Sequence, residues 1–159
     1  TTLLCCLLAV SASAATVASG SCGVGLSWCL SDTGRFTILS DCYNANPSSM
    51  RASLESFLSE RSELPRVCIL GDMLELGEWS AEEHRSIVEL IAAADFERIW
   101  LVGKHFTEAA TTIANNPRVS CFASREQVAE RLETDPIEGA LVLVKGSHSI
   151  GLEKLIPLL

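Results

Sequence analysis

The chain has 159 residues, of which 48% are apolar and 20% are charged. That length and balance suit one domain with a buried core and exclude a disordered chain. The net charge of −8, without a run of Lys or Arg, argues against a surface that binds nucleic acid, because phosphate contacts need a clustered positive field.

The first segment, TTLLCCLLAVSASAATVASG at residues 1–20, imitates a secretory signal peptide, since an apolar run is followed by small residues. No Lys or Arg precedes the apolar run, and Ser and Gly soon dilute it, so a membrane span is not expected. We expect residues 1–33 to form a short Ala/Ser-rich helical remnant of a preceding domain. A signal or membrane segment and a sequence artefact are the alternatives, and the absence of an initial Met indicates a fragment.

From residue 35 onward, short apolar segments alternate with amphipathic ones, which predicts strands alternating with helices. Strands are predicted at residues 35–39, 66–72, 98–103, 118–123 and 139–147. Helices are predicted at residues 48–60, 80–94, 105–116, 124–134 and 150–159. This order predicts an α/β domain over residues 34–159, with a mostly parallel sheet and helices on both faces.

Local signals mark where three of the helices begin. Pro47 stands just inside the first helix, where its missing N–H costs nothing. Ser80 with Glu83, and Ser124 with Gln127, match the capping-box pattern, in which a serine and the residue three positions later satisfy each other's backbone amides.

The sequence has seven cysteines and three histidines. The cysteine number is odd, no Cys-x-x-Cys pair occurs, and Cys68 lies inside an apolar strand, where a buried thiol is ordinary. These observations predict reduced thiols in a cytoplasmic protein. The histidines are too scattered for the ligand spacing of a metal site, so no metal is expected.

Polar clusters follow four of the predicted strands, and ligands of open α/β sheets bind outside the carboxyl ends of strands. The clusters are SDCYNANP at residues 40–47, LGDMLELG at 70–77, VGKHF at 102–106 and VKGSHS at 144–149. Each also fits a plain strand-to-helix turn, because Gly, Asp, Asn and Ser favour turns for backbone reasons.

Two of these clusters suggest a chemistry. Lys145 and Ser147 at a helix N-terminus, with Gly146 allowing close approach of a ligand, suit a carboxylate or phosphate. Asp72 and Glu75 could bind a substrate ammonium group or cap a helix. The chain contains no GxxxxGK[ST] phosphate loop, so it has no phosphate cradle of its own, and no nucleophile with a base is evident.

The motifs DCYNANPSSMRASL, LGDMLELGEWSAEEH and LVKGS occur in this order and resemble the C-terminal domain of the Mur ligase family over residues 34–159. The resemblance implies a Rossmann-like fold and an enzyme of three domains, of which the central ATPase carries the phosphate loop. Residues 1–33 would be a remnant of that central domain. The implied reaction, in peptidoglycan synthesis, is ATP-dependent ligation of D-alanyl-D-alanine to UDP-N-acetylmuramoyl-tripeptide through an acyl phosphate.

The resemblance also implies site residues. On the ATP side of the cleft it places Arg35, Asp41, Tyr43, Asn44 and Asn46. On the D-Ala-D-Ala side it places Lys145, Gly146, Ser147, Asp72 and Glu75. His148 stands where the family more often has Arg. The Mg²⁺ that accompanies ATP would be held mainly by the central domain. Because the chain lacks a phosphate loop, it is expected to have no ligase activity alone.

Two other functions fit the residues. A free-standing α/β module could use the same strand-end turns to bind a nucleotide or an amino acid. A secreted domain would use residues 1–20 as its signal. An upstream phosphate loop in the same reading frame would favour the ligase, and a start codon followed by Lys or Arg would favour secretion.

Overall fold

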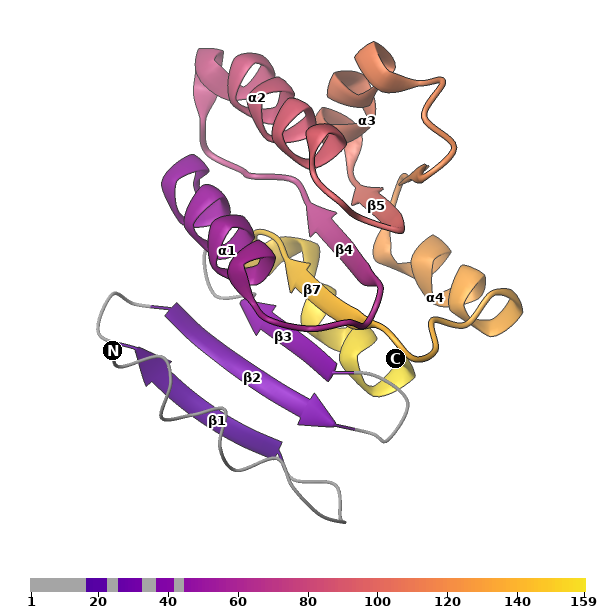
Figure 1. The fold of residues 1–159 in the computed structure, drawn as a ribbon. Coiled ribbons are helices and arrows are strands. Elements are labelled where there is room, and N and C mark those ends of the chain that lie inside the picture. The colour runs from indigo at the N-terminus through magenta and orange to yellow at the C-terminus, as the bar shows by residue number, and fades with distance from the viewer. Residues whose placement is uncertain (1–16, 23–25, 33–36, 42–44) are drawn as a thin grey trace.

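The computed structural model describes residues 17–22, 26–32, 37–41 and 45–159. Its middle layer is a sheet whose described strands follow the order β1-β2-β3-β7-β4-β5-β6 (Figure 1). As predicted, the larger part of this sheet is parallel. The parallel strands, in spatial order, are β3 (Thr37–Asp41), β7 (Leu141–Lys145), β4 (Arg66–Gly71), β5 (Arg98–Val102) and β6 (Val119–Phe122).

The first two strands, β1 (Val17–Cys22) and β2 (Leu26–Asp32), show that the helical prediction for residues 1–33 is wrong in these segments. They form an antiparallel pair, and β2 pairs in the same way with β3, so both extend the parallel sheet at its edge (Figure 1). These two segments contain a single Ala, Ala18, so the Ala-rich composition of residues 1–20 does not describe them, and cross-strand pairing sets their structure. Residues 1–16 lie outside the described residues, and the domain boundary near residue 33 stays a prediction.

Helices cover both faces of the sheet, which confirms the predicted layering (Figure 1). One face carries α1 (Pro47–Ser59), α2 (Ser80–Ala93) and α3 (Lys104–Ala109). The opposite face carries α4 (Arg125–Thr134) and the 3-10 helix η6 (Leu152–Leu158). Because these strands run parallel, every strand-to-helix turn of this part begins at the same edge of the sheet.

Neighbouring residues of β4 belong to different cores. Cys68 and Leu70 pack in the core beneath α1, α2 and α3, whereas Val67 and Ile69 pack in the core beneath α4 and η6. This division follows from the pleat of a strand, which sends successive side chains to opposite faces. Burial on both faces explains why this strand reads as a continuous apolar run, and each such side chain contributes about 1.5–3 kcal/mol.

Two of the predicted helices differ from their expected form. The helix predicted at residues 105–116 is α3 followed by a 3-10 segment, η4 (Ala110–Ile113). The hydroxyls of Thr111 and Thr112 donate to carbonyls three residues earlier, at 2.8 and 3.0 Å, and such bonds compete with the α-helical pattern. The closing helix predicted at residues 150–159 is the 3-10 helix η6.

Neither predicted capping box forms. Ser80 lies inside α2 rather than before it, and Glu83 pairs instead with Arg51 of α1 at 2.9 Å. Ser124 is the N-cap of α4, but its side chain makes no capping hydrogen bond. Gln127 accepts the amide one residue upstream of that serine, at 2.8 Å. Pro47 does occupy the start of α1, as predicted.

Candidate functional site

The carboxyl ends of the parallel strands lie side by side at one edge of the sheet. In the strand register, Asp41 is opposite Lys145, and Lys145 is opposite Leu70. Gly71 is opposite Val102 of β5. The segments that leave these strands therefore begin at the edge where ligands of open α/β sheets bind. We name this edge, formed by the described residues 40, 41 and 45–47 together with residues 70–77, 102–106 and 144–149, the carboxyl edge.

The residues predicted beside ATP are only partly described. Arg35, Tyr43 and Asn44 lie outside the described residues. Asp41 is the last residue of β3, which places its backbone at the carboxyl edge. Asn46 is exposed and precedes α1 as its N-cap.

Asn46 begins α1 through a capping box that the sequence pattern did not indicate. Its Oδ1 accepts the amide of Ser49 at 2.8 Å, and the Ser49 Oγ accepts the amide of Asn46 at 3.2 Å. Such a cap contributes about 1 kcal/mol to stability. Asn46, which is predicted to lie beside ATP, therefore also stabilises the start of α1, which covers the core beneath α1, α2 and α3.

Asp72, directly after β4, is a buried carboxylate that is 4% exposed. Its Oδ1 accepts the amide of Phe106 at 2.8 Å, and its Oδ2 accepts the amide of His105 at 3.0 Å. The carboxylate thus caps the N-terminus of α3, where negative charge is favourable because the first amides lack helical partners. Of the two roles that the sequence leaves open for Asp72, ammonium binding and helix capping, the structure contains the cap.

Gly103 makes room for this cap. Its φ is 114°, a left-handed conformation that favours glycine. A Cβ at this position would overlap the carboxylate of Asp72. The glycine after β5 is therefore required by the carboxylate that follows β4.

The turn after β7 is fastened to the turn after β4. The amide of Ser147 donates to the carbonyl of Asp72 at 3.2 Å, and the Ser147 Oγ accepts the amide of Leu74 at 3.0 Å. Gly146 lies so close to β4 that a Cβ would stand 3.0 Å from the Cα of Gly71. This glycine permits the approach of two strands, whereas the sequence suggested the approach of a ligand.

The anion site predicted at the end of β7 differs from its expected form. Lys145 is fully buried, and a buried ammonium is stable only with polar partners. Ser147 precedes η5 (His148–Ile150), which is a single 3-10 turn and not the start of a longer α-helix. His148 is exposed in this turn, with Nδ1 4.0 Å from the carboxylate of Glu153.

Asp72 and Glu75, which the sequence pairs, differ in their surroundings. Asp72 is buried, whereas Glu75 is exposed. Glu75 has a φ of 64°, the only positive φ among the described residues other than glycine, and Gly77 follows with a φ of 58°. A left-handed Glu costs about 1–2 kcal/mol, so residues 74–77 hold a strained bend next to the fastened turns.

His84 of α2 contacts the carboxyl edge but was not singled out by its sequence spacing. It is fully buried in α2, with Nε2 3.9 Å from the Oδ1 of Asp72. Burial lowers the pKa of His84 below its ordinary value. Its place in the sequence does carry a signal, because it precedes Ile87, Val88 and Ile91 by three, four and seven residues, the spacing of a core-facing helical stripe.

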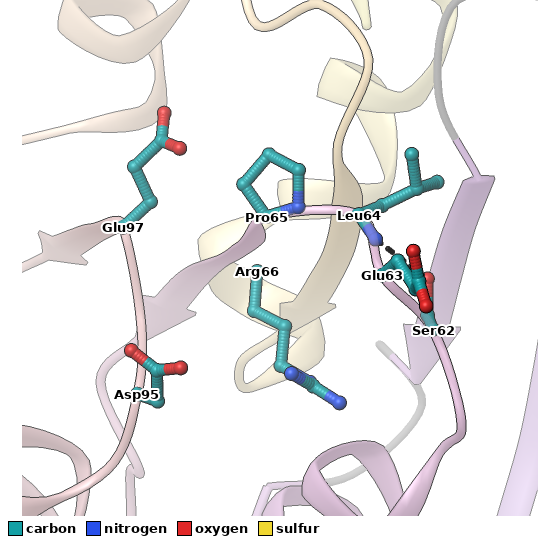
Figure 2. A pocket seen from close by; sticks show the side chains of 7 residues that line it. All are labelled: Ser62, Glu63, Leu64, Pro65, Arg66, Asp95 and Glu97. Carbon is teal, nitrogen blue, oxygen red and sulfur yellow. Dashed lines mark hydrogen bonds between the residues drawn. The ribbon is translucent and has the colours of Figure 1, made fainter.

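A polar depression of about 350 Å³ lies at the opposite edge, where β4 and β5 begin. Figure 2 shows its lining residues, Ser62, Glu63, Leu64, Pro65, Arg66, Asp95 and Glu97. Arg66 donates through Nη2 to the carbonyl of Glu60 at 2.8 Å. No predicted site residue with a described side chain lines this depression. We therefore place the candidate site at the carboxyl edge.

Other features of the described residues bear on function. Among them, no three His, Cys, Asp or Glu side chains gather as metal ligands. No described helix has the length and apolar character needed to cross a membrane. Cys68 is buried, as predicted, and Cys121 is exposed, and both are free thiols. Burial raises the pKa of the Cys68 thiol.

Comparison with known proteins agrees with the motifs. The family model described as the glutamate ligase domain of Mur ligases matches residues 29–148. The chain is 43% identical over 126 residues to UDP-N-acetylmuramoyl-tripeptide–D-alanyl-D-alanine ligase of Treponema pallidum, covering 77% of this chain and 27% of that protein. It is 28% identical over 137 residues to the Bacillus subtilis ligase of the same name, covering 84% of this chain and 30% of that protein.

Solved structures show the same likeness. A crystal structure of MurF from Acinetobacter baumannii has a TM-score of 0.64 and 28% identity, covering 77% of this chain and 27% of that one. The MurF ligase from Thermotoga maritima in complex with ADP has a TM-score of 0.62 and 21% identity, covering 96% and 32%, and shows the fold alone. The chain spans about a quarter to a third of the length of these proteins. Because the family model matches most of its residues, the chain belongs to the Mur ligase family.

Proposed function

We propose that the chain supplies the C-terminal domain of a UDP-N-acetylmuramoyl-tripeptide–D-alanyl-D-alanine ligase. The observation that carries this proposal is the 43% identity to a ligase of that name from Treponema pallidum. The gathering of the motif-bearing turns at the carboxyl edge supports it, because one bound substrate could touch several of them. The reaction would serve peptidoglycan synthesis in the cytoplasm.

The proposed reaction has two steps. ATP transfers its γ-phosphoryl group to the carboxylate of the UDP-linked tripeptide, which releases ADP and leaves an acyl phosphate. The amine of D-alanyl-D-alanine attacks the acyl carbon, phosphate leaves, and the nitrogen loses a proton. Closure of domains over this intermediate would exclude the water that hydrolyses it.

The phosphate loop for the first step would come from another domain, since this chain contains no GxxxxGK[ST]. The proposed contribution of this chain on the nucleotide side is Asp41, whose carboxylate can accept both ribose hydroxyls. The proposed nucleotide side also includes Arg35, Tyr43, Asn44 and Asn46. Mg²⁺ would be held mainly outside this chain, by the domain that carries the phosphate loop.

On the amino-substrate side, Asp72 and Ser147 would shape the pocket rather than bind the dipeptide by charge. Both carboxylate oxygens of Asp72 accept amides at the start of α3, and the Ser147 Oγ accepts the amide of Leu74. Lys145 and Gly146 would set the path of the turn that carries Ser147. Glu75, exposed on its strained bend, is the carboxylate left in reach of a substrate ammonium group.

The first test is the ligation itself. The complete gene product should join D-alanyl-D-alanine to UDP-N-acetylmuramoyl-tripeptide with release of ADP and phosphate, which mass spectrometry of the pentapeptide product detects. Residues 1–159 alone should form no product, because they lack a phosphate loop. Formation of the pentapeptide by residues 1–159 alone would contradict the assignment of the phosphate loop to another domain. A complete gene product that forms no pentapeptide would contradict the proposed function.

A second test concerns the nucleotide side. In the complete gene product, Asp41→Ala should raise the KM for ATP more than the KM for D-alanyl-D-alanine, because the ribose loses an acceptor. Steady-state kinetics with each substrate varied in turn measures the two effects. Asp41→Asn, which keeps the turn-forming preference, is the matched control. An equal rise of both KM values would identify Asp41 as a turn-former.

A further inference from the structure

His84 is enclosed between two segments of the carboxyl edge, the start of α3 and the turn after β4. Its ring packs edge-on against Phe106 of α3, with centroids 4.7 Å apart, and lies 5.3 Å from the ring of His105. The turn after β4 passes on its other side, with Asp72 Oδ1 3.9 Å from Nε2. A fully buried imidazole in this position contacts α3 and this turn at the same time.

The hydrogen bonds of His84 fix its tautomer. Nδ1 lies 2.7 Å from the carbonyl of Ser80, which can only accept, so Nδ1 carries the hydrogen. Nε2 lies 3.0 Å from the amide nitrogen of Met73, which can only donate, so Nε2 carries the lone pair. His84 is therefore neutral, with its hydrogen on Nδ1 and an acceptor on Nε2. The lowered pKa that burial gives it agrees with the neutral form.

The Nε2 acceptor holds the turn that carries the substrate-side residues. The amide of Met73 is bound by His84, and the next amide, of Leu74, is bound by Ser147. One residue earlier, Asp72 caps α3 through its carboxylate and receives the amide of Ser147 at its carbonyl. Residues 72–74 are thus fixed from α2, from α3 and from the turn after β7 at successive positions.

We propose that His84 is a positioning residue of the ligase site, whose Nδ1–H tautomer sets the course of residues 72–74 and thereby the placement of Ser147 against the amino substrate. The identity of the amino substrate rests on the proposed function, whereas the placement of the turn rests on the contacts alone.

A second proton on His84 would change these contacts. Protonated Nε2 can no longer accept the amide of Met73, and it becomes a donor 3.9 Å from the carboxylate that caps α3. The charged groups around the ring are Asp72 and Glu83, which favour the proton, and His105, which opposes it together with burial. The turn holds its observed form only while His84 is neutral.

Two variants separate the hydrogen bond from the shape of the ring. His84→Phe keeps a planar ring and removes both hydrogen bonds. His84→Gln is the matched control, because its amide oxygen reaches the position of Nε2 and can accept the amide of Met73. In residues 1–159, His84→Phe should speed hydrogen exchange at the Met73 amide about tenfold, and His84→Gln should leave it near the wild-type rate.

The wild-type protein offers a test that needs no substitution. Long-range nitrogen–proton NMR spectra should show His84 protonated at Nδ1 and unprotonated at Nε2 at pH 7.5. The opposite tautomer, or an imidazolium, would overturn the proposal even if His84→Phe fails to fold. Equal exchange rates at Met73 in the wild type and in His84→Phe would overturn it as well.

Kinetics of the complete gene product distinguish positioning from stability alone. His84→Phe should raise the KM for D-alanyl-D-alanine by about 10- to 100-fold with a smaller change in the KM for ATP, and His84→Gln should restore it. Because burial lowers the pKa of His84, its protonation should reduce kcat/KM only well below the ordinary imidazole pKa of about 6.5, and this loss should be weaker in His84→Gln than in the wild type. Equal KM changes for both substrates would overturn the positioning role. An inactive wild type would overturn the proposed function, while the tautomer and exchange results still decide the placement of the turn.

Discussion

Asp72 and Gly103 form one unit at the scale of single residues, because the carboxylate of the first occupies the space that a side chain on the second would need. The unit ties the end of β4 to the start of α3 through two amides at 2.8 and 3.0 Å. A hydrogen bond to a charged group contributes about 1.5–3 kcal/mol. A small substitution in this pair should therefore lower the free energy of unfolding more than a similar substitution elsewhere.

Gly103→Ala should lower the free energy of unfolding by at least about 2 kcal/mol, since it adds a left-handed alanine and displaces the Asp72 carboxylate. Gly139→Ala is the matched control, because Gly139 has a φ of 60° but a Cβ there meets nothing within 4 Å. Its cost should be the backbone strain alone, about 1 kcal/mol. Urea unfolding of both variants measures the difference. Equal costs would show that the carboxylate moves aside freely.

The sequence could place some of these residues but not assign their tasks. Asp72, Lys145 and Ser147 follow apolar runs, so their position at the carboxyl edge was predictable. The cap on α3 was not, because it joins residues that are 33 and 34 positions apart. His84 escaped notice for the same reason, since its acceptor role depends on a turn that only the fold brings near.

At the scale of elements, strands were more predictable than helix ends. The central parallel strands β4, β5 and β7 are buried and read as apolar runs, whereas helix ends depend on particular hydrogen bonds. Arg118 illustrates the point, because its guanidinium donates to the carbonyls of Ala92, Ala94 and Phe96 at 3.0–3.2 Å and so holds the end of α2 from the start of β6. No pattern in the sequence of α2 indicates this contact, because Arg118 lies beside a strand that comes later in the chain.

The cap of α1 gives a prediction at this scale. Asn46→Ala should lower the stability of the chain by about 1 kcal/mol, and Asn46→Ser should change it little, because serine also caps helices well. Thermal or urea unfolding measures both. If Asn46 also touches ATP, both variants should raise the KM for ATP in the complete gene product. An unchanged KM in Asn46→Ser would leave Asn46 as a cap alone.

At the scale of the whole molecule, the two cores share the central strands, so exposing the middle of β4 requires the sheet to open. Cys68 lies there, fully buried in the core beneath α1, α2 and α3. Burial also raises the pKa of its thiol, which suppresses the reactive thiolate. The thiol is thus a reporter of global unfolding.

Cys68 should react with a thiol reagent at least about 1000-fold more slowly than Cys121, because labelling must wait for unfolding, whereas Cys121 is exposed in the folded chain. Mass spectrometry of proteolytic peptides after timed labelling measures the two rates. In urea above the unfolding midpoint the rates should converge, which controls for intrinsic reactivity. Similar rates without urea would show that the core opens locally around β4.

The strand order has a consequence for how the chain is made. β3 and β4 do not pair with each other, because β7, the last strand, fills the space between them (Figure 1). A growing chain on the ribosome therefore carries two unfinished sheet edges until residue 145 has emerged, and such open edges invite pairing with other chains. The strand that joins the sheet also brings Lys145 and Ser147. Completion of the sheet and assembly of the carboxyl edge thus depend on the same strand, and a chain that ends before β7 lacks both the central strand and the turn that carries Ser147.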